Sequence, residues 1–138
     1  MTPRFLIDKS ALSRMPLTPV RARLQPVLEA GLAATCSIVD LEVLFSARNA
    51  EEHRQIRHRR SLAYARVPLT EAMFERAIEV QGLLAIQGQH RVPIPDLVIA
   101  ATAEVASLVV LHYDADFDRI ASVTAQPMEW VVPRGTVA

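Results

Sequence analysis

Short apolar segments alternate along this chain with longer segments whose apolar residues recur at helical spacing. Apolar runs of four or five residues bounded by polar residues, Gly or Pro are typical of buried strands. The predicted strands are residues 4–7, 32–35, 64–67, 108–111 and 128–132. Parallel strands need crossover connections, usually helices, so this alternation predicts an α/β fold with a mainly parallel central sheet.

The helical segments carry start and stop signals. The predicted helices are residues 10–15 (a helical turn), 20–31, 37–47, 50–62, 70–88, 97–106 and 116–122. Thr70 is placed to cap the helix that it precedes. Ser37 and Asp40 have the S-x-x-D spacing of a capping pair, so the cap accounts for Asp40. Asp96 is likewise placed to cap an almost entirely apolar helix, which we expect to be buried.

Length and composition limit the class of protein. The chain has 138 residues, of which 51% are apolar, so we expect one domain over residues 1–138 with an aliphatic core. Cys36 is the only cysteine, which excludes an internal disulfide and a cysteine zinc site. The longest apolar stretch, residues 97–111, contains Glu104 and is too short to span a bilayer. We therefore expect a cytoplasmic protein without membrane contact.

Several carboxylates lie where an apolar or neutral residue is expected. Asp8 ends a predicted strand, and Glu42 lies on an otherwise apolar helical stripe. Asp96 begins the most apolar helix, while Asp114 and Asp116 closely follow the strand at 108–111. Each has a simpler interpretation taken alone, as a loop residue, a helix cap, an ion-pair partner or part of a turn.

Taken together, these acids predict a metal site. In parallel sheets, ligands bind outside the carboxyl ends of the strands, where Asp8 and Asp114 are placed. Carboxylates gathered there repel one another unless a cation lies among them. Oxygen ligands favour Mg²⁺, with Mn²⁺ as a substitute. The four His are scattered along the sequence, which argues against a His-based transition-metal site.

Four motifs give the chain a resemblance to a known family. They are FLIDKS at residues 5–10, SIVDLE at 37–42, PDLVIAATA at 95–103 and LHYDADF at 111–117. In order and spacing they resemble the PIN-domain ribonucleases, and within these the VapC-type toxins of bacterial toxin–antitoxin pairs. The likeness covers essentially the whole chain.

The resemblance implies a three-layer α/β/α fold and a Mg²⁺- or Mn²⁺-dependent endoribonuclease. By motif, Asp8, Glu42, Asp96 and Asp114 take the family's catalytic acidic positions. All four are candidate metal ligands. Asp116 matches a further, less constant acid, so either it or Asp114 is the fourth ligand. Ser10 matches a hydroxyl residue near the first acid.

The chain departs from the family pattern at two positions. Lys9 stands where a small residue is usual, and His112 where Thr is common. His112 is accordingly either structural or a contact for RNA or water.

A basic segment after the Glu42 helix is the candidate RNA-binding face. Arg54, Arg57 and Arg60 are our predicted phosphate contacts, and a solvated helix surface is the alternative. Without the five candidate site acids, fifteen cations face ten remaining acids, which favours a polyanionic substrate. A non-catalytic RNA- or protein-binding module on the same fold is the alternative function.

Two protein partners are expected. The high apolar content predicts a homodimer, with Leu24, Leu28 and the helix around residues 73–84 as candidate interface unless these residues are core. The resemblance implies a cognate antitoxin that covers the acidic groove, where an Arg of the antitoxin would pair with the carboxylates.

Overall fold

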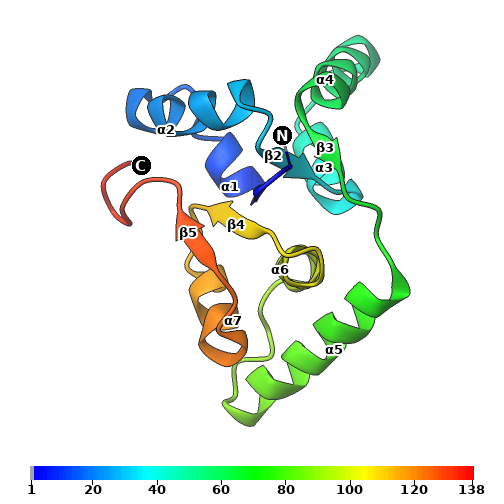
Figure 1. The fold of residues 1–138 in the computed structure, drawn as a ribbon, viewed down its shortest axis with the longest axis vertical. Helices are drawn as coiled ribbons and strands as arrows, with labels where there is room; N and C mark the ends of the chain where they lie inside the picture. Colours follow the sequence, from blue (N-terminus) through cyan, green and yellow to red (C-terminus); the bar gives the residue numbers. More distant parts are fainter. Residues whose placement is uncertain (1) are drawn as a thin grey trace.

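The computed structural model describes residues 2–138, which form one five-stranded sheet (Figure 1). The strands are β1 (Phe5–Ile7), β2 (Ala33–Thr35), β3 (Ala65–Arg66), β4 (Val109–His112) and β5 (Met128–Trp130). Their order is β3-β2-β1-β4-β5, and every neighbouring pair is parallel. All five predicted strands therefore form, and the predicted parallel α/β sheet is confirmed.

Seven helices lie between the strands in the described range 2–138. They are α1 (Lys9–Leu12), α2 (Thr18–Glu29), α3 (Ser37–Leu44), α4 (Ala50–Ala63), α5 (Glu71–Ile86), α6 (Ile94–Val105) and α7 (Asp116–Thr124). Thr70 caps α5 by accepting a hydrogen bond from the Met73 N–H, as predicted. Asn49 caps α4 in the same way, with the Glu52 N–H as donor.

Two predicted caps are wrong. The N-cap of α3 is Cys36, so Ser37 already lies inside the helix and makes no capping hydrogen bond. Helix α6 begins three residues earlier than predicted, after Pro93, and Asp96 lies within its first turn. Pro95 fits into the first turn of α6 because the N–H that a proline lacks would have no partner within the helix at this position. Capping therefore accounts for neither Asp40 nor Asp96.

The sheet separates two apolar layers because successive side chains of a strand point to opposite faces. Leu6 packs into a cluster built largely from α5, α6 and α7. Its neighbours Phe5 and Ile7 pack on the other face with α1 and α2. The result is the predicted three-layer α/β/α arrangement, in which α6 is buried along most of its length.

The residues proposed for a dimer interface belong mostly to this core, which corrects the prediction. Leu24 is fully buried under the sheet, and Leu28 is half-buried beside it. Four residues of α5 in the range 73–84 are buried in the opposite layer: Met73, Ala77, Val80 and Leu84. Within residues 2–138, no helix is long and apolar enough to cross a membrane.

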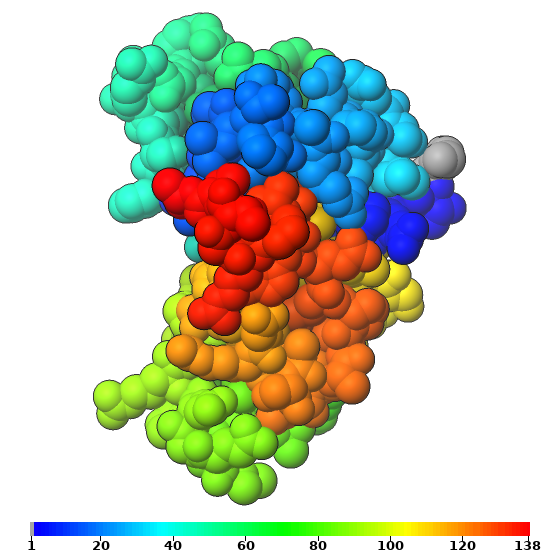
Figure 2. Space-filling view, turned by 90° about the vertical axis from the view of Figure 1, so that its left-hand side faces the viewer, coloured from blue at the N-terminus to red at the C-terminus, as the bar shows by residue number. Residues whose placement is uncertain are grey.

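The C-terminal segment fastens the loop that leaves β4. The Tyr113 hydroxyl accepts hydrogen bonds from the N–H groups of Gly135 and Val137, and donates to the Val137 carbonyl. Arg14 donates to the terminal Ala138 carbonyl at 2.8 Å. In Figure 2 this segment (red) lies against the blue helices near the N-terminus. The C-terminal segment therefore fixes the position of Tyr113, the residue just before Asp114.

Candidate metal centre

The candidate site lies where β1 and β4 meet at their carboxyl ends. The chain passes from β1 to β2 and β3 on one side, and places β4 and β5 on the other. Such a reversal of strand order opens a crevice in which α/β proteins bind ligands. Ile7 pairs with Leu111, and the Asp8 N–H donates to the Leu111 carbonyl at 2.9 Å. The first acid is therefore fixed beside the exit of β4.

Three carboxylates converge at this position. Asp96, Asp114 and Asp116 each offer an oxygen, and the three oxygens lie within 4.8 Å of one another. We call this set the acidic trio. The Asp116 N–H donates to Asp114 Oδ1 at 2.9 Å, which holds the loop before α7 in place. From the sequence, either Asp114 or Asp116 was expected to be the fourth metal ligand. In the structure, both carboxylates lie close to that of Asp96.

Asp8 and Glu42 lie outside the trio and carry buried oxygens without partners. Asp8 Oδ2 accepts a hydrogen bond from the Ser10 N–H at 2.9 Å, but Oδ1 has no hydrogen-bond partner within residues 2–138. Glu42 Oε1 is also buried and unpaired in this part of the chain. A buried acceptor without a donor is costly and uncommon in folded proteins. A cation bound among these oxygens would satisfy both.

Burial and mutual repulsion act on the proton affinity of these acids. Burial, together with the charges of Asp8, Asp114, Asp116 and Glu42, raises the pKa of Asp96 from 3.8 to about 8. Burial and then the charge of Asp8 raise the pKa of Glu42, against the opposing charge of Lys9. Burial also raises the pKa values of Asp8 and Asp116. A bound divalent cation would reverse these shifts because it favours the ionised carboxylates.

Ser10 and His112 orient the acids. The Ser10 hydroxyl accepts a hydrogen bond from the Tyr113 N–H at 2.8 Å, which ties α1 to the loop after β4. His112 is completely buried, and its ring lies 5.0 Å from the rings of both Phe117 and Trp130.

The protonation of His112 follows from this environment. Burial lowers the pKa of His112 to about 4, so the ring is neutral, and Nδ1 accepts a hydrogen bond from the Asp114 N–H. Of the two interpretations of His112, the structure supports the structural one: the ring positions Asp114.

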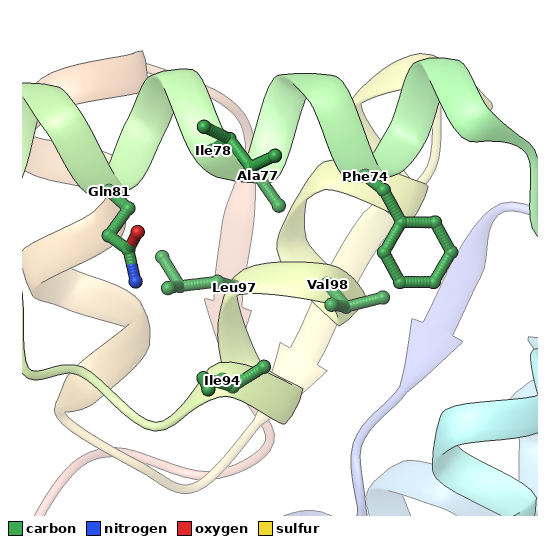
Figure 3. Close-up of a pocket in the computed structure, with 7 residues that line it drawn as sticks. All are labelled: Phe74, Ala77, Ile78, Gln81, Ile94, Leu97 and Val98. Carbon is green, nitrogen blue, oxygen red and sulfur yellow. The ribbon is translucent and has the colours of Figure 1, made fainter.

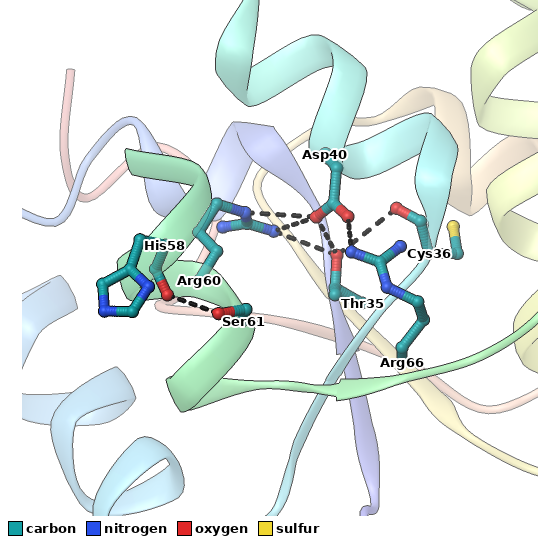
Figure 4. A network of polar contacts seen from close by, with 7 residues as sticks. All are labelled: Thr35, Cys36, Asp40, His58, Arg60, Ser61 and Arg66. Carbon is teal, nitrogen blue, oxygen red and sulfur yellow. Dashed lines mark hydrogen bonds and ion pairs between the residues drawn. The ribbon is translucent and has the colours of Figure 1, made fainter. Parts of the chain in front are cut away.

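Asp40 forms an ion-pair network with α4 and β3 (Figure 4). Its carboxylate accepts from the Thr35 hydroxyl at 2.8 Å and pairs with Arg60 at 3.1 Å. Arg66 also pairs with it. Burial by itself would raise the pKa of Asp40, but the hydrogen bonds from Arg66, Thr35 and Arg60 outweigh burial and lower it. Asp40 therefore ties α3 to β2, β3 and α4 instead of capping α3.

The same network removes Arg60 from the candidate RNA-binding face. Arg60 is only 9% exposed, and its guanidinium also bonds Thr35 and lies over the Tyr64 ring. A side chain held this way is not available to a phosphate, so that prediction is wrong for Arg60.

The other two predicted RNA contacts lie on the exposed surface of α4. Arg54 pairs with Glu51 in the first turns of the helix. Arg57 forms no ion pair or side-chain hydrogen bond within the described chain and lines a cavity of about 310 Å³ between α3 and α4. Both are accessible to a phosphate group.

One residue near the trio was missed by the sequence analysis. Arg119 of α7 donates to Asp116 Oδ1 at 2.8 Å. The signal was present in the sequence, because residues three apart on a helix are neighbours and an Asp–Arg pair at this spacing is favourable. Arg119 brings a positive charge to the edge of the acidic site.

Sequence comparison identifies the family. The PIN domain family model matches residues 5–123. Ribonuclease VapC21 of Mycobacterium tuberculosis is 50% identical over 137 residues, which cover 99% of both chains. Ribonuclease VapC51 of the same organism is 45% identical with the same coverage.

Solved structures share the fold. VapBC2 from Rickettsia felis, bound to a promoter DNA fragment, contains a chain that matches with a TM-score of 0.75 and 15% identity. The match covers 94% of this chain and 99% of that one. VapBC-1 from nontypeable Haemophilus influenzae also gives a TM-score of 0.75, with 16% identity and coverage of 95% and 98%. With its fold, its acidic site and its full-length relatives in agreement, this chain belongs to the PIN-domain family and, within it, to the VapC ribonucleases.

Proposed function

We propose that the protein is a Mg²⁺-dependent endoribonuclease, with Mn²⁺ as a possible substitute, and the toxin of a type II toxin–antitoxin pair. The observation that carries this proposal is the acidic trio together with the unpaired buried oxygens of Asp8 and Glu42. The full-length relatives named as ribonucleases support the reaction class.

The donor set fits a hard divalent cation, which prefers carboxylate oxygens. Asp96, Asp114 and Asp116 would hold the ion, and Asp8 and Glu42 would complete the set or orient a water molecule. A bound Mg²⁺ supplies an acidified water and neutralises charge on the phosphate. The protein's own contribution is to fix the carboxylates: Ser10 holds Asp8, and His112 and Asp116 hold the loop of Asp114.

Metal binding is testable without activity. Mg²⁺ or Mn²⁺ should raise the melting temperature, because a ligand bound only by the folded state stabilises it by about 2.7 kcal/mol at one hundred times its Kd. Asp96→Asn should reduce that shift strongly, while Glu75→Gln on the exposed surface of α5 should not. Equal calorimetric binding of Mg²⁺ by the wild type and Asp96→Asn would remove Asp96 from the ligand set.

The RNA-binding face is proposed to include Arg54 and Arg57. Each phosphate contact to a single strand adds about 0.7 to the slope of log affinity against log salt, so replacing both by Ala should lower the slope by roughly 1.4. The measurement is RNA binding by fluorescence anisotropy over a salt series. An unchanged slope would mean that this face of α4 is only solvated.

A cognate antitoxin is the proposed protein partner. The solved VapBC neighbours support the fold of such a toxin. A cationic side chain of the antitoxin would relieve the repulsion among the carboxylates in the way that a metal does. We therefore expect inhibition by the antitoxin to compete with Mg²⁺ and to weaken in an Asp8→Asn, Asp96→Asn double variant.

A homodimer is proposed through an apolar groove between α5 and α6, in place of the residues that belong to the core. The groove has a volume of about 220 Å³, and Figure 3 shows Phe74, Ile78 and Ile94 around it. Ile78 and Ile94 are 62% and 69% exposed. The proposed occupant is the same surface of a second copy, because a two-fold interface is self-complementary and protruding Ile78 can enter the partner's groove.

The dimer is tested by light scattering at micromolar concentration. We expect a dimer mass for the wild type and a monomer for Ile78→Asp, since a charge on this face opposes its burial. Leu62→Asp, which alters another exposed apolar residue on α4, is the control and should remain dimeric. A monomer mass for the wild type would reject the dimer.

A further inference from the structure

A basic recess, separate from the basic surface of α4, adjoins the acidic trio. It has a volume of about 360 Å³, which falls in the range of roughly 300–1,000 Å³ typical of ligand sites. Its lining residues are Gly88, Gln89, His90, Arg91, Val92 and Arg119. We call it the Arg91 recess. Its lining comes from the α5–α6 loop and from α7. These two segments lie near one another on the α6 side of the sheet (Figure 1).

Arg119 connects this recess directly to the metal centre. Its guanidinium donates to Asp116 at 2.8 Å, and 55% of its side chain remains exposed. One side chain therefore touches a carboxylate of the acidic trio and also lines the recess. A ligand in the recess would lie immediately beside a group bound at the trio.

The loop that carries Arg91 is anchored at both ends. At its start, Gly88 has φ +71° and ends α5, with hydrogen bonds from the Gly88 N–H to Ala85 and from the Gln89 N–H to Leu84. Glycine adopts this left-handed conformation without steric cost, and the bond pattern is that of a Schellman cap. At its end, Val92 is 4% exposed and packs in the core. Arg91 therefore projects from a fixed loop.

The recess presents donors and positive charge without an acid of its own. None of its six lining residues is acidic. Within residues 2–138, Arg91 forms no ion pair or side-chain hydrogen bond, so its guanidinium is available for a ligand. Guanidinium groups match the geometry of phosphate oxygens and can bind them through two hydrogen bonds. The chemistry is therefore that of a phosphate site.

We propose that the Arg91 recess binds the phosphate next to the one that is cut, on the same RNA strand. The inference rests on the proposed ribonuclease function and adds a second anchor to it. When the phosphate that is cut lies at the acidic trio, the neighbouring nucleotides of the RNA lie over the surfaces on either side of the trio. Arg54 and Arg57 are positioned on α4, whereas Arg91 and Arg119 hold the strand from the α7 side.

The test uses an RNA that the wild type cleaves, with its cleavage position mapped. Short oligonucleotides spanning that position are lengthened by one to three nucleotides on the 5′ side or on the 3′ side. Extension on the side that reaches the Arg91 recess should increase kcat/KM for the wild type. Arg91→Ala should reduce that increase roughly three- to tenfold, as expected for one partly exposed charged contact. The salt slope of RNA binding should fall by about 0.7.

The control is Arg21→Ala on α2, an exposed arginine whose side chain bonds only to the Pro16 carbonyl in the described part of the chain. It should retain both the gain from extension and the wild-type slope. An Arg91→Ala protein with an unchanged gain and slope would overturn the proposal. The proposal would also be overturned if Arg91→Ala bound an inhibitory partner protein more weakly than the wild type does but bound and cleaved RNA normally. The recess would then be a contact for that partner.

Failure of the ribonuclease function gives a different result. A wild type that binds RNA but cleaves none of it with Mg²⁺ or Mn²⁺ would refute the proposed reaction. The anisotropy measurement would still decide whether Arg91 contacts the RNA, because it does not depend on cleavage. A wild type that binds no RNA at all would reject both proposals.

Discussion

Asp96→Asn is expected to lower RNA cleavage by at least about a thousandfold, as is typical when a central group of a catalytic site is removed. Asp96 is 7% exposed and lies with Asp114 and Asp116 at the centre of the acidic site. Asn keeps the shape of the side chain but removes its negative charge, so the site loses cation affinity. Asp8→Asn and Glu42→Gln should have effects of similar size. The measurement is single-turnover cleavage of a labelled RNA.

The loss must be separated from misfolding. The pKa of Asp96 is about 8 in the folded chain against an ordinary 3.8, so ionised Asp96 destabilises the fold. Without metal, this contribution makes stability fall as the pH rises from about 4 through about 8. Asn has no such penalty, so metal-free Asp96→Asn should melt no lower than the wild type at pH 8. Cleavage at the wild-type rate by folded Asp96→Asn would contradict the assignment.

Asp40→Ala is expected to destabilise the protein by about 3 kcal/mol, because removing one partner of a buried ion pair leaves the other charge uncompensated. Arg60 is 9% exposed and would keep only Thr35 and the Tyr64 ring as partners. Helix α4 would then lose its ion pair with α3. Chemical denaturation of the metal-loaded protein measures the change.

A surface ion pair on the same helix is the matched control. Glu51 pairs with Arg54 at an exposed position, so Glu51→Ala should change stability by less than about 1 kcal/mol. Equal effects of the two substitutions would show that the Asp40 network contributes no more than a surface contact.

The acids of the site could be predicted because each breaks a local pattern. Asp8 follows a fully apolar strand, and Glu42 interrupts an apolar helical stripe. In parallel sheets the carboxyl ends of strands face one side, so the order of elements was enough to bring these residues to one region. The finer arrangement depended on the loop after β4, where the Asp116 N–H bonds to Asp114 and holds both acids near Asp96.

Asp40 and Arg60 show where sequence reasoning fails. Asp40 has suitable spacing for a capping pair, but the backbone enters α3 one residue earlier than that pair requires. Its actual partners lie 5, 20 and 26 residues away. Such long-range contacts depend on how α4 packs, which no local pattern records. Arg60 consequently looked like one more member of a basic surface.

The interface prediction failed for a similar reason. Helical periodicity finds an apolar stripe, and on α5 that stripe is the core face with Leu84. The second apolar surface of α5, with Phe74 and Ile78, becomes visible only when α6 is seen beside it.

The central claim is that the carboxylates of this fold cut RNA with a bound divalent cation. It is tested most directly by incubating the purified wild type with RNA in Mg²⁺, in EDTA, and in EDTA followed by excess Mg²⁺. We expect cleavage in the first and third conditions and none in the second, with Asp96→Asn inactive in all three. RNA that is bound but left intact in every condition would favour the non-catalytic module, and cleavage unaffected by EDTA would contradict the metal-dependent mechanism.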